Sequence, residues 1–190
     1  MHHFIFDVES IGLHGEGFAV GWVVINDIGA ELSSGLAHCR SDNARGTDDG
    51  RRWIENNVPE LQGIYCQDPV DVRFAFWDVW EHWKSRGAQL WCDCGWPVEA
   101  RFLAQCVDDD PVKREWQGPY PLHEIATLAL ASGVNPLESW PRLSDELPQH
   151  NPLCDARQSA RLLSDLFREP VLRNKFYMAY DEPVPYRGVK

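Results

Sequence analysis

The stretch FIFDVE, residues 4–9, decides how the chain begins to fold. Aromatic and β-branched residues favour a strand, and the side chains of a strand alternate between two faces. The apolar residues at positions 4, 6 and 8 therefore share one face, which we expect to be buried, while Asp7 and Glu9 share the other. Two carboxylates on one face of an apolar strand are either a solvated strand end or a pair of ligands for a hard cation.

A second stretch, HNPLCD at residues 150–155, stands almost at the other end of the chain. Asn151 followed by Pro152 combines an N-cap residue with proline at the first helical position, and this predicts a helix that runs to about Phe167. Asp155 in its first turn is favoured by the helix dipole alone. In a functional site, it would hold a metal ion, with His150 ahead of the helix as a general base. The apolar side chains with which this helix is expected to pack on the core are Leu153, Ala156, Ala160, Leu163 and Phe167.

The remaining pattern predicts one α/β domain over residues 1–190, with helices that cover a mixed sheet. Three early strands with short turns indicate an antiparallel meander. Residues 135–149 hold three prolines and predict an irregular crossing, and residues 177–190 predict an irregular tail. The expected strands are 1–8, 18–25, 32–39 and 89–94, and the expected helices are 51–57, 69–86, 97–106, 122–132 and 152–167.

The net charge of −11 argues against a protein that tracks nucleic acid through a long basic groove. Bound divalent cations would reverse the field locally, so the charge is compatible with a nuclease that makes few phosphate contacts. No apolar run approaches the ~18 residues of a membrane span, and the first residues lack the features of a secretory signal. With six cysteines and no such signal, we expect reduced thiols and a cytoplasmic location.

Taken together, the two stretches resemble the DEDDh family of 3′→5′ exonucleases. The match consists of Asp7-x-Glu9 at the end of a first strand and His150-x-x-x-x-Asp155 at a late helix start. The resemblance covers roughly residues 4–167. It implies an RNase H-like fold, a mixed five-stranded sheet with its first three strands antiparallel, flanked by helices. The segment WIENNVP at 53–59 and the strand at Leu90 are most similar to small bacterial and phage exoribonucleases.

The family's third aspartate has two candidates in this chain. Glu99 occupies the position by helix phase, and Asp93, at the end of the preceding strand, matches by residue type. The sequence does not decide between Glu99 and Asp93. The resemblance implies that one of them joins Asp7, Glu9 and Asp155 in binding two Mg²⁺ or Mn²⁺ ions, as in two-metal hydrolysis.

Substrate contacts are implied by position as well. The residues after Glu9 match the family stretch that touches the terminal nucleotide, and Trp96 lies between the two candidate acids, where an exposed ring would stack on a base. Arg101 and Arg157 either hold phosphates or are simply solvated. The stretch after Glu9 comprises Ser10, Ile11, Gly12 and Leu13.

We therefore expect a metal-dependent 3′→5′ exonuclease that prefers RNA to DNA and releases nucleoside 5′-monophosphates. Its expected partners are short single-stranded RNA or DNA 3′ ends, with no membrane, and a second copy of the chain is also allowed. The alternative is a catalytically impaired RNase H-like protein that binds a nucleotide, an RNA end or a protein partner. A hydrolase of small phosphoesters is a third reading.

Overall fold

The computed structural model describes residues 1–168 and has an α/β architecture. A six-stranded mixed sheet, in the order β4-β3-β2-β1-β5-β6, forms the middle layer. The predicted tail at 177–190 lies outside the described residues. The strands are β1 (His2–Ser10), β2 (Gly17–Asn26), β3 (Glu31–His38), β4 (Ile64–Tyr65), β5 (Ala88–Cys92) and β6 (Leu122–Glu124). The helical elements are η1 (Ser41–Asn43), α1 (Asp48–Asn57), α2 (Pro69–Lys84), η2 (Gly95–Glu99), α3 (Ala100–Asp109), α4 (Pro111–Arg114), α5 (Ile125–Ala131), η3 (Ser144–Glu146) and α6 (Pro152–Arg168).

The first three strands form the predicted antiparallel meander, and β5 then pairs with β1 in parallel. The prediction of five strands was wrong, because the sheet has six. Two strands, β4 and β6, were not predicted from the sequence. Strand β4 is only two residues long and pairs in parallel with the end of β3. The predicted helix at 122–132 was also wrong at its start: its first three residues form β6, and helix α5 begins only at Ile125.

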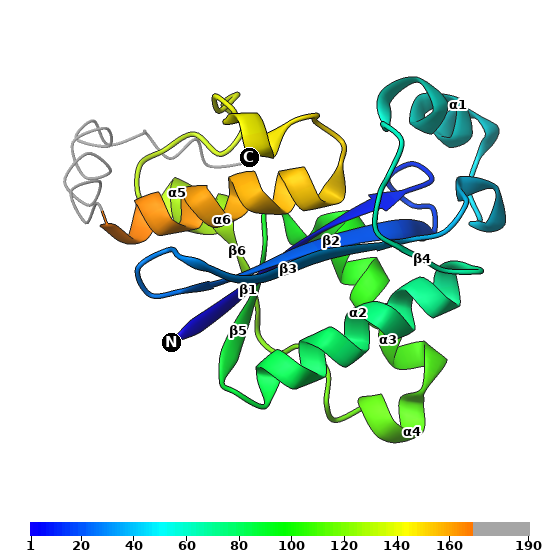
Figure 1. Cartoon of the computed structure of the whole chain (residues 1–190), viewed down its shortest axis with the longest axis horizontal. Helices are drawn as coiled ribbons and strands as arrows, with labels where there is room; N and C mark the ends of the chain where they lie inside the picture. Colours follow the sequence, from blue (N-terminus) through cyan, green and yellow to red (C-terminus); the bar gives the residue numbers. More distant parts are fainter. Residues whose placement is uncertain (169–190) are drawn as a thin grey trace, which may run out of the picture.

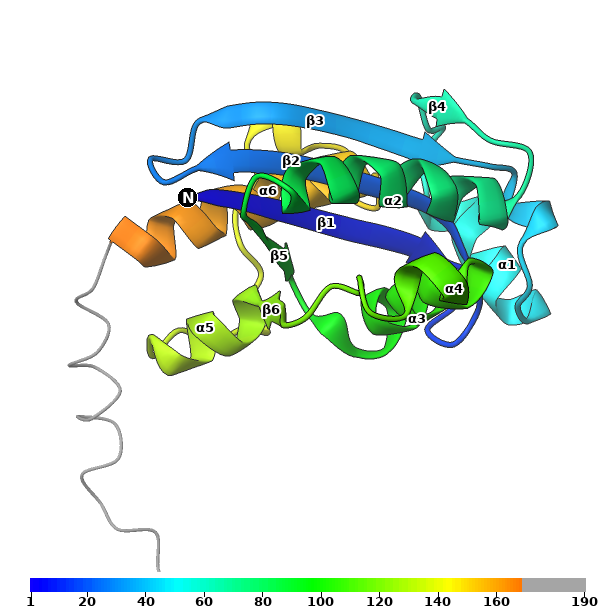
Figure 2. The same cartoon turned by 90° about the horizontal axis from the view of Figure 1, so that it is seen from below.

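Helices cover both faces of the sheet, as Figure 1 shows: α5 and α6 lie on one side, and α2, α3 and α4 on the other. Figure 2 shows α2 running along the strands of the meander. The two layers enclose separate apolar cores. Phe4, Phe6 and Val8 belong to the core under α2, whereas Ile5 belongs to the core under α6. The alternation predicted for β1 is confirmed, and it directs Asp7 and Glu9 toward the α6 side.

Both proline-containing helix starts are confirmed. Asp68 Oδ1 accepts hydrogen bonds from two backbone amides in the first turn of α2, at 2.9 and 3.0 Å. Asn151 Oδ1 accepts one from the amide of Leu153 at 3.1 Å, at the start of α6. No helix within residues 1–168 is both long and apolar enough to cross a membrane.

Gly21 on β2 determines how closely α6 can approach the sheet. It lies directly opposite Asp7 in the β1–β2 pairing. A Cβ atom at this position would overlap with the backbone of Pro152 and Leu153. Backbone atoms in the first turn of a packed helix cannot move aside as a flexible side chain can. The absence of a side chain at Gly21 therefore allows the start of α6 to lie over the strand that carries Asp7.

Gly21→Ala should consequently destabilise the protein by about 1–3 kcal/mol, the usual cost of overpacking a well-filled interior. The measurement is the free energy of unfolding from urea titration. Gly118→Ala is the matched control, because a Cβ there would meet only the Val107 side chain at 3.9 Å, an ordinary contact distance. If both variants unfold at the wild-type midpoint, α6 does not pack on β2 as described.

Candidate metal centre

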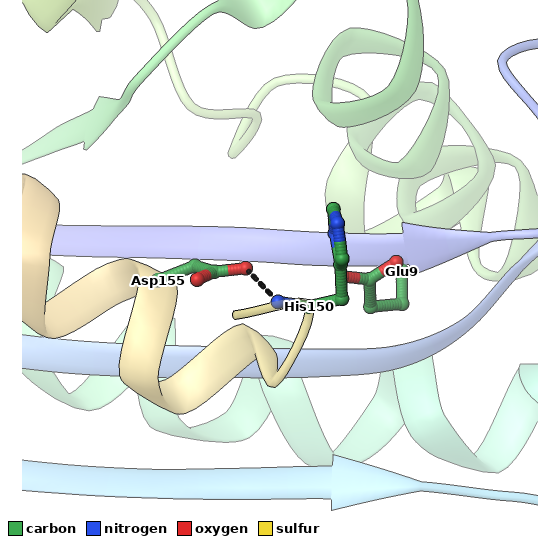
Figure 3. A group of neighbouring side chains, drawn as sticks. All are labelled: Glu9, His150 and Asp155. Atoms are coloured by element: carbon green, nitrogen blue, oxygen red, sulfur yellow. Dashed lines mark hydrogen bonds and ion pairs between the residues drawn. The ribbon is translucent and has the colours of Figure 1, made fainter. Parts of the chain in front are cut away.

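Glu9, His150 and Asp155 converge at the end of β1. One potential ligand atom from each lies within 4.8 Å of the others, close enough to share a single cation. Figure 3 shows Glu9 on β1, Asp155 in the first turn of α6 and His150 in the loop that leads into that turn. The two stretches singled out in the sequence are thus brought together, although they are separated by most of the chain.

His150 is held by its backbone as well as by its ring. Its φ angle is +61°, in the left-handed region that non-glycine residues rarely adopt. The backbone amide donates a hydrogen bond to Asp155 Oδ2 at 3.1 Å, which fixes this turn. The imidazole Nδ1 lies 3.8 Å from Glu9 Oε1. On its other side the ring packs edge-to-face against Trp53 of α1, with ring centroids 4.8 Å apart.

Asp7 lies two residues before Glu9 on β1, so the two side chains share one face of the strand. Burial raises its pKa well above the usual range, and the charges of Asp155, Glu99, Glu9 and Asp93 raise it further. Burial, followed by the charges of Asp155 and Glu99, raises the pKa of Glu9 to about 8. These carboxylates are therefore close enough to oppose one another's ionisation, as expected for acids that share one desolvated site.

Glu99 and Asp93 both belong to this acidic neighbourhood but differ in burial. Glu99 is only 9% exposed. Burial raises its pKa to about 7, although the nearby backbone amides of Glu99 and Val8 favour the charged form. Val8 separates Asp7 from Glu9, so this contact places the Glu99 carboxylate against the same part of β1. Asp93 has an exposed side chain, and it also lines a cavity of about 540 Å³ beside α5 and α6.

Arg142 is a member of this site that the sequence did not reveal. Its guanidinium donates from Nη1 to Asp155 Oδ1 and to the carbonyl oxygen of Glu146. Burial raises the pKa of Asp155 in spite of this pairing. Both oxygens of Asp155 are thus engaged, one by Arg142 and one by the His150 amide. Each carboxylate oxygen can accept more than one contact, so Asp155 can still bind a cation.

Two further residues near the site were missed. Trp53 had been noted only as part of a family-like segment, and nothing in its spacing pointed to His150. Glu124 ends β6, in a segment predicted to be helical; its carboxylate accepts hydrogen bonds from Gly95 N at 2.8 Å and Thr127 Oγ1 at 2.7 Å. Glu124 thereby fixes the turn between Asp93 and Glu99.

The predicted substrate stretch is only partly accessible. Ile11 is buried, and Ser10 is also buried, with its hydroxyl donating to Gly12 O at 2.8 Å. Gly12 has a φ angle of +72°, which explains why a glycine turns the chain there. Leu13 and Trp96 are exposed by 67% and 73%. The side chains open to a ligand are therefore those of Leu13 and Trp96, and the others shape the loop.

The two arginines for which phosphate binding or simple solvation stayed open have different surroundings. Arg157 donates to Glu31 Oε2 at 3.4 Å and is directed toward β3. Arg101, on α3, makes no such contact within residues 1–168 and lines a different cavity, with His14 and Arg45.

No protein-family model matches this chain, and no curated protein matches it either.

The donor set fits a hard divalent cation. Carboxylate oxygens are the preferred ligands of Mg²⁺ and Mn²⁺, and imidazole is a further ligand or base. Among residues 1–168, Arg142 is the only arginine or lysine that pairs directly with one of the five clustered carboxylates. Added positive charge would therefore relieve a repulsion that the protein itself only partly balances.

The acids of this centre should make the metal-free protein less stable as the pH rises. The pKa of Glu9 is raised from 4.5 to about 8 in the folded state. At pH values between these two, Glu9 is protonated in the folded protein and ionised in the unfolded chain. The unfolding free energy then falls with pH across this window, by about 1.4 kcal/mol per unit of pKa shift at most.

Glu9→Gln removes this titration. In EDTA its unfolding free energy should decline less between pH 5 and 8 than that of the wild type, so the two curves diverge as the pH rises. Glu115→Gln, at an exposed site, is the control and should run parallel to the wild type. Parallel curves for Glu9→Gln would show that Glu9 titrates normally and that the centre is not strained by its own charge.

Proposed function

We propose that this protein is a metal-dependent 3′→5′ exonuclease, acting on RNA in preference to DNA and releasing nucleoside 5′-monophosphates. The observation that carries the proposal is the meeting of Glu9, His150 and Asp155 within 4.8 Å, close to Asp7 on the same strand. These three residues belong to the set that the family resemblance implies, and they come from both ends of the described chain. The antiparallel meander followed by strands parallel to β1 supports an RNase H-like assignment of the fold.

The carboxylates of Asp7, Glu9, Glu99 and Asp155 would hold two Mg²⁺ or Mn²⁺ ions. Such ions lower the pKa of a bound water and stabilise the leaving 3′-oxygen. The protein's own contribution is to orient the base. The Glu9 carboxylate near His150 Nδ1 favours a proton on that nitrogen, which leaves Nε2 free to accept one from water. Trp53 packs against the same ring and limits its rotation.

Exposed apolar side chains flank the acids and suit a nucleotide. Leu13 lies in the turn after β1, which follows Glu9, and Trp96 lies in η2, the element that contains Glu99. An aromatic face stacks on any base, and this makes such contacts tolerant of sequence. We assign both residues to the terminal nucleotides of a single strand.

Arg142 favours a second candidate function. Its guanidinium already neutralises part of Asp155, which is how a site without metal would balance its charge. In that case the protein would bind a nucleotide, an RNA end or a protein partner without hydrolysis. The two candidates differ in one measurable property, which is turnover that depends on a divalent cation.

The test is hydrolysis of a 5′-labelled single-stranded RNA, and of the matching DNA, with millimolar Mg²⁺ or Mn²⁺. We expect products that shorten from the 3′ end, and no products in EDTA. Asp7→Asn should be inactive, and His150→Ala should be slower by ~10²–10⁴-fold, the usual effect of removing a general base. Equal cleavage by wild type and Asp7→Asn would assign the activity to a contaminant. Binding of RNA without cleavage under either metal would support the second candidate.

The fourth carboxylate is predicted to be Glu99. Because Glu99 is buried against β1, Glu99→Gln should abolish hydrolysis and also the rise in melting temperature that Mn²⁺ produces in the wild type. Asp93→Asn should keep the Mn²⁺ effect and lose at most 10–100-fold in rate, as a supporting residue does. The opposite pair of results would make Asp93 the ligand and Glu99 the supporting residue.

A further inference from the structure

A second, polar cavity lies beside the acidic centre, between the β1–β2 turn and α3. Its volume is about 280 Å³, and its charged or polar lining comes from His14, Glu16, Arg45, Arg101 and Gln105. Helix α3 packs closely on this turn, since a Cβ at Gly17 would lie 2.9 Å from the Phe102 ring. The cavity is therefore bounded by fixed elements on two sides.

Arg101 stands apart from every other basic side chain in the part of the chain that the structure describes. Each of the other lysines and arginines in residues 1–168 donates to a carboxylate or to a carbonyl oxygen. Arg101 makes neither kind of contact there. Arg51, Arg86 and Arg114 also lack an acidic partner, but each donates to a carbonyl oxygen, which Arg101 does not do within residues 1–168. Its five donors are available to a ligand.

The one carboxylate of this cavity is already engaged. Glu16 accepts from Arg73 Nη1 at 3.0 Å and from the backbone amide and Nε of Arg45 at 3.0 and 3.3 Å. Arg45 remains 87% exposed in its side chain, so most of its guanidinium is also accessible. The balance at the cavity is positive, because Arg101 and part of Arg45 carry charge that Glu16 does not neutralise. This is the reverse of the acidic centre next to it.

The cavity and the acidic centre are joined by short connections. Arg101 is two residues beyond Glu99, at the start of α3. The β1–β2 turn begins directly after Glu9, and the amide of Ile11 donates to Glu16 O at 3.1 Å to close it. A strand whose 3′ end lies at the carboxylates would therefore pass positive side chains as it leaves them.

We propose that this cavity binds a backbone phosphate of the nucleic acid strand, on the 5′ side of its terminal nucleotide. The proposal rests on the proposed function and extends it: the substrate is an oligonucleotide that reaches past the carboxylates, held by Arg101 with help from Arg45. An arginine guanidinium donates two parallel hydrogen bonds to phosphate oxygens, which makes it well suited to this role.

The test measures binding of a fluorescein-labelled ten-nucleotide RNA by anisotropy, in Mg²⁺, with Asp7→Asn as the background that prevents turnover. Arg101→Gln should weaken binding about tenfold, as the loss of a charge-assisted hydrogen bond does. The slope of log affinity against log salt should also fall by about 0.7, the value for one phosphate contact on a single strand. Arg101→Lys should restore the slope, because it restores the charge.

Arg157→Gln is the matched control, since Arg157 is an arginine two residues from Asp155 that pairs with Glu31 instead. It should leave affinity and slope unchanged. If Arg101→Gln and Arg157→Gln behave alike while the wild type degrades RNA, the phosphate site is wrong and the proposed function stands. If the wild type binds RNA through Arg101 without degrading it, the proposed function is wrong and the phosphate site stands. No binding of RNA at all would overturn both.

Discussion

The close approach of α6 to the sheet at Gly21 is the contact on which the candidate site depends. Gly21 lies opposite Asp7, and the first turn of α6 occupies the space where its side chain would be. This contact places Asp155 beside the acids of β1. The position of His150 depends in turn on Asp155, which accepts the hydrogen bond that holds His150 in its left-handed conformation. The apolar stripe of α6 keeps the whole turn in place by packing on Ile5 and Val23.

Two opposing contributions to the stability of the folded state meet at this site. The hydrophobic contacts of α6 stabilise the folded state, while the acids they bring together oppose it through burial and repulsion. Arg142 reduces the cost at Asp155, but Glu9 and Glu99 keep raised pKa values. The core thus holds the carboxylates in an arrangement that is unfavourable without added positive charge. The divalent cations of the proposed function would supply that positive charge.

Local signals predicted the elements that carry the candidate site. The alternation in β1 and the Asn151–Pro152 helix start are both decided within a few neighbouring residues, and both are confirmed. The strands that were missed are β4 and β6, and β6 occupies the first three residues of the helix predicted at 122–132. They are two and three residues long and exist through pairing with β3 and β5, which are distant in sequence. Strands this short have no periodicity of their own to detect.

Arg142 was missed for a related reason. It lies 13 residues before Asp155, in a segment whose prolines predicted only irregular structure. Its position is fixed by contacts that the segment makes with α6: Arg161 donates to Pro141 O at 2.8 Å and to the buried Glu146 carboxylate at 2.6 Å. These contacts belong to the folded chain, and no spacing rule relates residue 142 to residue 155. The sequence likewise leaves Asp93 and Glu99 open, because no local pattern predicts that the Glu99 side chain is buried and the Asp93 side chain exposed.

Two groups of buried charges in this protein show how stability and function differ. Arg73 joins Glu16 and Asp109 in a nearly inaccessible cluster in which each carboxylate has a guanidinium partner at 2.6–3.0 Å. Such a cluster satisfies itself and holds α2, α3 and the β1–β2 turn together. The acidic centre has the opposite character, because within residues 1–168 its five carboxylates have a single arginine partner, Arg142. An unbalanced, desolvated charge of this kind lowers the stability of the fold, so its presence is better explained by a ligand than by structure. Arg101, which has no carboxylate or carbonyl partner among residues 1–168, gives the adjacent cavity the opposite sign of imbalance. The nucleic acid strand of our proposals would meet both, with its 3′ end at the acids and a phosphate at Arg101.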